Sequence, residues 1–213
     1  MRRTVLVLVV MVVMVATLVV ASGVALAVVR EGGPGNDTLF GTWGSDTLEG
    51  KRGNDTLVGL AGGDWLLGGG SNDTLRGQAA GDELWGGPAT DYVYGGPGND
   101  FVLGDETLFG NVSTSQAGDD VIFGGPGREA VHGEGGDDVI FGGDGNDNAS
   151  PVSIGGLYGG LGEDVIRGGD GNDFVVGAHD GGQRDRLYCG RGRDEYLADN
   201  IDYVSSSCEV RAH

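Results

Sequence analysis

A nine-residue period in residues 32–103 constrains the fold of this chain more than any other feature. Eight consecutive units fill this range without a gap; the first reads GGPGNDTLF and the last GGPGNDFVL. Every unit has glycine at position one, aspartate at position six, and leucine or valine at position eight. A fixed short period predicts a solenoid, in which each unit buries its apolar residue by stacking on its neighbours.

The period continues beyond residue 103 with two interruptions. Residues 104–109 look like a shortened unit, and residues 110–114 form a small insertion. The nine-residue phase resumes at residue 115, breaks at a loop over residues 148–156, and returns in the units GGLGEDVIR and GGDGNDFVV. Insertions in a solenoid form loops at one edge. We therefore expect one continuous stack.

The units resemble the GGxGxDxUx nonapeptide repeat of the RTX, or haemolysin-type calcium-binding, family. The resemblance implies an all-β fold, a right-handed parallel β-roll in which two units make one coil and turns on each edge stack 18 residues apart. It also implies two ladders of position-six aspartates. One would contain Asp37, Asp55, Asp73 and Asp91, and the other Asp46, Asp64, Asp82 and Asp100.

The chemistry of the turns also favours calcium. Calcium takes roughly six to eight oxygen ligands from carboxylates and carbonyls, and glycine lets backbone carbonyls crowd toward one point. Stacked carboxylates about 4.8 Å apart repel one another unless a cation lies between them. We therefore predict several Ca²⁺ ions. The predicted ligands are Asp37, Asp46, Asp55, Asp64, Asp73, Asp82, Asp91, Asp100, Asp120, Asp138, Asp147, Asp164 and Asp173.

Four residues depart from the repeat pattern. Ser71, Ala80 and Ala89 stand at position four of three consecutive units, where the family has glycine, and Glu129 replaces aspartate at position six. These departures weaken the prediction of calcium sites within residues 68–94 and at Glu129.

The charge balance restricts the partners. The chain has 213 residues, of which 32 are Asp or Glu and 13 are Lys or Arg, for a net charge of −19. Such a charge argues against nucleic acid and anionic membranes as partners and suits cations. Low hydrophobicity with high charge also predicts that the bare chain does not fold alone.

Both ends of the chain differ from the repeats. Residues 1–27, with two early arginines, an apolar run and Ala25-Leu26-Ala27, are typical of a secretory signal peptide. The alternative is a membrane anchor over residues 4–29. Residues 28–180 are the predicted roll, and residues 181–213 a capping segment. Cys189 and Cys208 are predicted to form a disulfide, because they are the only cysteines and the exterior is oxidising.

The sequence predicts a secreted calcium-binding protein with a structural or adhesive role at the cell exterior, and no enzyme. It contains no G-x-S-x-G, H-E-x-x-H or P-loop motif. One alternative is a polysaccharide-acting enzyme or accessory module. Another is an ice- or surface-binding solenoid, because Thr38, Thr56 and Thr74 recur 18 residues apart. An extracellular protein or polysaccharide partner and the oligomeric state are left open.

Overall fold

The structure is a computed structural model, which describes residues 26–105, 117–148, 155–177 and 182–212. Nearly all of the predicted signal segment, residues 1–27, lies outside the described residues. The described residues form β-strands without a helix. The strands are β1 (Val29–Glu31), β2 (Thr38–Phe40), β3 (Thr47–Arg52), β4 (Thr56–Ala61), β5 (Trp65–Gly70), β6 (Thr74–Ala79), β7 (Glu83–Trp85), β8 (Tyr92–Tyr94), β9 (Phe101–Leu103), β10 (Val121–Gly127), β11 (Ala130–Gly135), β12 (Val139–Gly145), β13 (Gly156–Leu161), β14 (Val165–Asp170), β15 (Phe174–Val176), β16 (Arg186–Arg191), β17 (Glu195–Leu197), β18 (Tyr203–Val204) and β19 (Val210–Arg211).

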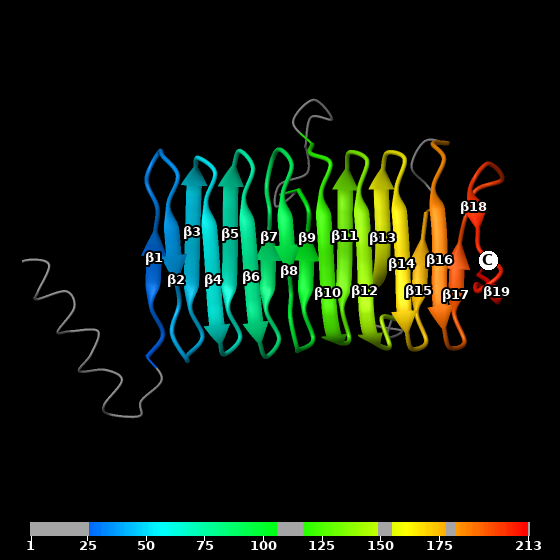
Figure 1. The fold of residues 1–213 in the computed structure, drawn as a ribbon, viewed down its shortest axis with the longest axis horizontal. Coiled ribbons are helices and arrows are strands. Elements are labelled where there is room, and N and C mark those ends of the chain that lie inside the picture. The colour runs from blue at the N-terminus through cyan, green and yellow to red at the C-terminus, as the bar shows by residue number, and fades with distance from the viewer. Residues whose placement is uncertain (1–25, 106–116, 149–154, 178–181, 213) are drawn as a thin grey trace, which may run out of the picture.

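Successive strands alternate between two parallel sheets (Figure 1). The odd-numbered strands form a ten-stranded sheet and the even-numbered strands a nine-stranded sheet, each in chain order. Thr38 pairs with Thr56, and Thr56 with Thr74, so the register advances by one coil of two units. The result is a parallel β-solenoid of about nine turns, which confirms the predicted all-β roll. No described helix could cross a membrane.

The core is a double row of aliphatic side chains from position eight. In a strand, alternate side chains face opposite sides of the sheet, so position eight faces inward while positions seven and nine face out. The fully buried members are Leu48, Leu57, Leu66, Leu75, Leu84, Val93, Val102, Ile122, Val131, Ile140, Leu157, Ile166, Val175 and Leu187. Each coil therefore buries two aliphatic side chains, a thin core for so many ordered residues.

The insertions leave the stack intact. β8 pairs with β10 and β9 pairs with β11 across the segment at residues 106–116. β13 pairs with β11 on one side and with β15 on the other. The expectation of one continuous stack is confirmed.

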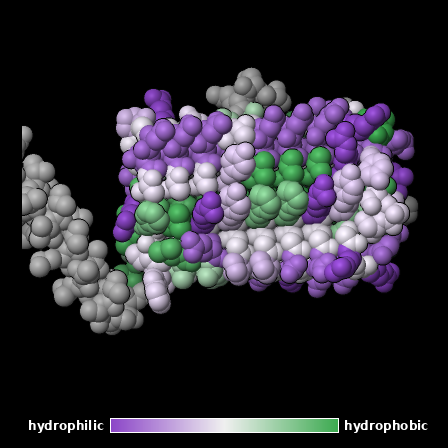
Figure 2. Space-filling view, in the orientation of Figure 1, coloured by the Kyte–Doolittle hydropathy of each residue, from purple (hydrophilic) through white to green (hydrophobic). Residues whose placement is uncertain are grey.

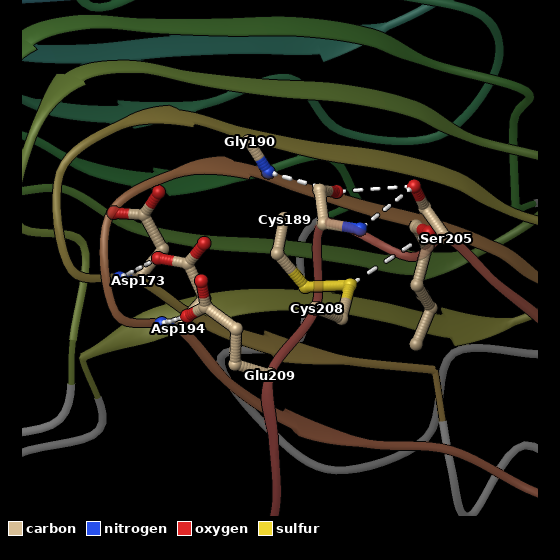
Figure 3. The surroundings of a disulfide bond; sticks show 9 residues. Asp173, Cys189, Gly190, Asp194, Ser205, Cys208 and Glu209 are labelled. Atoms are coloured by element: carbon tan, nitrogen blue, oxygen red, sulfur yellow. Dashed lines mark hydrogen bonds between the residues drawn. A yellow bond between two sulfur atoms is a disulfide. The ribbon is translucent and has the colours of Figure 1, made fainter.

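The tail extends both sheets. β16 and β18 join the nine-stranded sheet, and β17 and β19 join the ten-stranded sheet. The predicted disulfide between Cys189 and Cys208 is present, with the two Cα atoms 5.0 Å apart (Figure 3). It links β16 to the segment between β18 and β19. The capping role of residues 181–213 stays a prediction.

Candidate metal sites in the turns

An acidic residue stands directly before nearly every strand. These side chains form two columns, one leading into each sheet. The column before the even-numbered strands contains Asp37, Asp55, Asp73, Asp91, Asp120, Asp138, Asp164, Asp185 and Asp202. The column before the odd-numbered strands contains Asp46, Asp64, Asp82, Asp100, Glu129, Asp147, Asp173, Asp194 and Glu209. All thirteen predicted ligands lie in these columns, together with five acidic residues that were not in the predicted set.

Backbone hydrogen bonds hold one oxygen of these carboxylates in place. The N–H of Asp55 donates to Oδ1 of Asp73 at 2.7 Å, and the N–H of Asp82 donates to Oδ1 of Asp100 at 2.8 Å. The same bond recurs from coil to coil along both columns. The same kind of bond ends on Glu209 at the end of one column, where the N–H of Asp194 donates to its Oε2 at 2.9 Å.

The second carboxylate oxygen is the exceptional feature of the turns. In many of the column residues this oxygen is buried and accepts no hydrogen bond from the protein. These residues include Asp55, Asp64, Asp73, Asp82, Asp91, Asp100, Asp120, Asp138, Asp147, Asp173 and Asp194. A buried charged oxygen without a partner costs several kcal/mol. Each of these oxygens therefore needs a proton or a cation.

The position-one glycines show where these oxygens point. A methyl group added to Gly68 would lie 2.6 Å from Asp73 Oδ2 and 2.4 Å from the carbonyl oxygen of Gly86, one coil further on. At Gly95 the corresponding distances are 2.5 Å to Asp100 Oδ2 and 2.6 Å to the carbonyl oxygen of Gly124. A carboxylate oxygen and a carbonyl oxygen thus converge on one place, where only glycine leaves room. Calcium prefers this donor set.

The electrostatics are consistent with a cation in these turns. Burial raises the pKa of Asp91, Asp120 and Asp138 to about 9, with neighbouring carboxylates adding to the shift. Burial likewise raises the pKa of Asp64 and Asp73 to about 6. Without a cation the folded turns resist ionisation, and a bound cation would reverse that preference.

Side chains alone do not complete a metal site. Among the residues that the structure describes, no three acidic, histidine or cysteine side chains lie close enough together to hold a metal ion. Each turn offers one position-six carboxylate. An ion would therefore take most of its ligands from backbone carbonyls, which suits calcium better than a metal that selects nitrogen or sulfur.

The units that lack glycine keep the same backbone. Ser71, Ala80 and Ala89 adopt positive φ values of 91°, 93° and 86°. At position two, Lys51 and Leu60 do the same. The stacked neighbours impose the turn on these residues, and the aspartates that follow them stay in their columns.

The side chain of Glu129 is longer than those of the aspartates in its column. It is buried and lies beside the carboxyl group of Asp147. Burial and this neighbour raise the pKa of Glu129. The sequence pattern identified Glu129 as a departure, and the structure places it in the same column as the aspartates.

One family model matches most of the repeat region. The model of the RTX calcium-binding nonapeptide repeat (4 copies) matches residues 31–57, 40–75, 49–82, 67–102, 114–149 and 157–178, which together exceed half of the chain. No curated protein matches the sequence.

Proposed function

This chain belongs to the RTX calcium-binding nonapeptide-repeat family, and from this premise we propose that its turns bind several calcium ions and that the roll folds when they bind. The observation that carries the proposal is the row of buried carboxylate oxygens without a protein partner. Ions that bind only the folded chain stabilise it by mass action. The expected affinity is that of extracellular calcium modules, roughly 10⁻⁴–10⁻³ M.

A calcium titration followed by far-UV circular dichroism tests this proposal. The full chain in chelator should be largely disordered and should gain β-structure cooperatively as calcium reaches the millimolar range. Magnesium at the same concentration is the matched control, because it demands tight octahedral geometry and gives up its waters reluctantly. Equal β-signal and melting temperature with and without calcium would contradict the proposal.

We place the protein at the cell exterior. The apolar segment in residues 1–27 supports a cleaved signal peptide, and the disulfide suits an oxidising compartment. N-terminal sequencing of the exported protein should give Val28 as the first residue. An intact Met1 in the membrane fraction would support the anchor over residues 4–29 instead.

The adhesive part of the proposal is supported by the outer face of the nine-stranded sheet, seen in Figure 2 as a pale and green band. Positions seven and nine of its strands contain three arginines and no acidic residue, although the chain as a whole is strongly acidic. The side chains are Thr38, Phe40, Thr56, Val58, Thr74, Arg76, Tyr92, Tyr94, Val121, Phe123, Val139, Phe141, Val165, Arg167, Arg186, Tyr188 and Tyr203.

Stacked rings hold two of these arginines in place. Phe123 and Phe141 stack with their ring centres 4.8 Å apart. The Arg167 guanidinium lies over Phe141 at 5.7 Å and over Tyr188 at 4.9 Å, and Arg76 lies over Tyr94 at 4.6 Å. Ordered cations among side chains that include no acidic residue fit an anionic polysaccharide.

Binding to immobilised dextran sulfate in calcium tests the adhesive role, with neutral dextran as the ligand control. Arg167→Gln should weaken binding severalfold. Arg193→Gln is the matched variant, because Arg193 is exposed in a turn away from this face. Equal binding by the two variants would contradict the role of the face.

The enzyme and ice-binding alternatives are less well supported. The RTX repeat family is typically structural. Thr38, Thr56 and Thr74 stack in register as predicted, but Tyr92 is next in the row. Thermal hysteresis in calcium would support the ice-binding alternative. Activity on acidic polysaccharides would support the enzyme alternative.

A further inference from the structure

The ten-stranded sheet has an arginine at the core position of both of its end strands. β1 pairs with β3 so that Arg30 lies beside Leu48, and β19 pairs with β17 so that Arg211 lies beside Tyr196. Leu48 belongs to the core and Tyr196 packs against it, and both stand at position eight. Since side chains alternate along a strand, Arg30 and Arg211 face the same side of the sheet as the core.

These arginines stand where the apolar core ends. Leu39 and Val204, at position eight of the first and last strands of the nine-stranded sheet, are partly buried and pack against the core. Each end of the core therefore consists of one aliphatic side chain and one exposed arginine. Arg211 is held at its end of the core, because its Nη2 donates to the carbonyl oxygen of the buried Ala198 at 2.7 Å.

The two ends of the roll otherwise fit one another. β1 and β2 lie at one end and β18 and β19 at the other (Figure 1). All pairs are parallel, so β19 of one copy could pair with β1 of a second copy, and β18 with β2. Exposed strand edges are templates for such pairing. Within the roll the N–H of Asp37 donates to Oδ1 of Asp55, and the N–H of Asp202 would meet the carboxylate of the second copy's Asp37 in the same way.

We propose that Arg30 and Arg211 close the two ends of the roll against a second copy, so that the folded protein is a monomer. In a head-to-tail stack that keeps the register, the two guanidinium groups would face one another across one strand spacing of about 4.8 Å. Like charges directly opposite in a sheet are destabilising, and burying them without a counter-charge is strongly unfavourable. The ion pairs within the described residues include neither arginine. Inward-facing charges are a known protection of strand edges.

Sedimentation velocity of the exported protein in saturating calcium tests this inference. The wild type should sediment as a monomer. Arg30→Leu/Arg211→Leu should form oligomers whose mean mass rises severalfold with protein concentration, because a head-to-tail contact does not close. Arg30→Leu alone should stay monomeric, since stacking would bury Arg211 against a leucine. Arg52→Leu/Arg193→Leu is the matched control, because it removes the same charge at exposed positions outside the core and should stay monomeric.

Charge exchange separates stacking from nonspecific aggregation. Arg30→Glu would place a carboxylate opposite Arg211 of the next copy, so this variant should associate. Arg30→Glu/Arg211→Glu restores like charges and should be monomeric. Circular dichroism checks that each variant has the β-signal of the wild type, and the charge-exchange pair decides if the leucine variant loses that signal. Monomers for both Arg30→Leu/Arg211→Leu and Arg30→Glu would overturn the inference. Association of the wild type, or equal association of both charge-exchange variants, would also overturn it.

Discussion

Replacing Asp91 by asparagine should change stability in opposite directions with and without calcium. Asp91 is fully buried, and its Oδ1 accepts the N–H of Asp73 at 2.7 Å, a bond that asparagine can keep. Its Oδ2 is buried without a partner. Asp91→Asn therefore leaves the shape and the hydrogen bond of the turn in place and removes only the ionisable group.

The size of the effect follows from the pKa. Burial raises the pKa of Asp91 from 3.8 to about 9. At about pH 7.5 the folded, calcium-free chain must protonate a group that is ionised when unfolded. Each pKa unit corresponds to about 1.4 kcal/mol, so this protonation opposes folding by up to about 5 kcal/mol. Asparagine removes the cost of this protonation, so the free energy of unfolding in chelator should rise by up to about 5 kcal/mol.

Calcium reverses the sign of the effect. In the proposed calcium form, Asp91 is a carboxylate ligand that asparagine would replace with a weaker neutral oxygen. The variant should therefore show more β-structure than the wild type in chelator and a lower melting temperature in saturating calcium. Far-UV circular dichroism and thermal melting in both solutions measure this, with Asp119→Asn as the exposed control.

Two results would contradict this role of Asp91. A loss of stability in both solutions would mean that Asp91 acts only as a turn former whose charge is tolerated. No change in either solution would mean that the buried carboxylate neither opposes folding nor binds the ion. Only a gain of stability in chelator together with a loss of stability in calcium fits a buried carboxylate that binds a cation.

The acidic columns, the disulfide and the positive φ of Ala80 should each have a measurable effect on stability. The buried aspartates of the folded, calcium-free protein hold protons that the unfolded chain releases, so its stability should rise as pH falls from about 9 to about 4. Far-UV circular dichroism in chelator across this pH range measures the β-structure. A steady loss of β-structure on acidification would contradict the prediction. Replacing Cys189 and Cys208 by serine should destabilise the calcium form by about 3 kcal/mol in urea titrations, and an unchanged midpoint would refute this. Ala80→Gly should stabilise the calcium form by about 1 kcal/mol, because Ala80 has a φ of 93°, which strains a residue with a side chain. The control Ala79→Gly lies in a strand and should destabilise the calcium form. Equal shifts in melting temperature for the two variants would exclude backbone strain at Ala80.

The regular part of the roll was predictable from the sequence because its register follows directly from the period. Two units of nine residues place Thr38 beside Thr56 and Leu39 beside Leu57, as observed. The alternation of side chains within a three-residue strand then assigns position eight to the core. The two aspartate columns follow from the same arithmetic.

The irregular parts were less predictable because their loops change the spacing. Asp185 lies 21 residues after Asp164, and Asp202 lies 17 residues after Asp185, so a nine-residue frame does not identify them. Asp105 stands in a shortened unit, where its position in the turn is visible only after β9 is paired with β11. The positive φ of Lys51 shows a similar limit, because stacked neighbours, and not its own preference, impose that conformation.

Burial of the column carboxylates differs between the two columns. In the column before the even-numbered strands, burial raises the pKa of Asp73 to about 6 and that of Asp120 to about 9. In the other column, burial raises the pKa of Asp100, which also lies in the middle of the roll, only to about 6. The calcium-free fold therefore disfavours ionised carboxylates most strongly in the middle of one column. In a solenoid each coil contacts only its neighbours, so a change at these turns acts first on the adjacent coils.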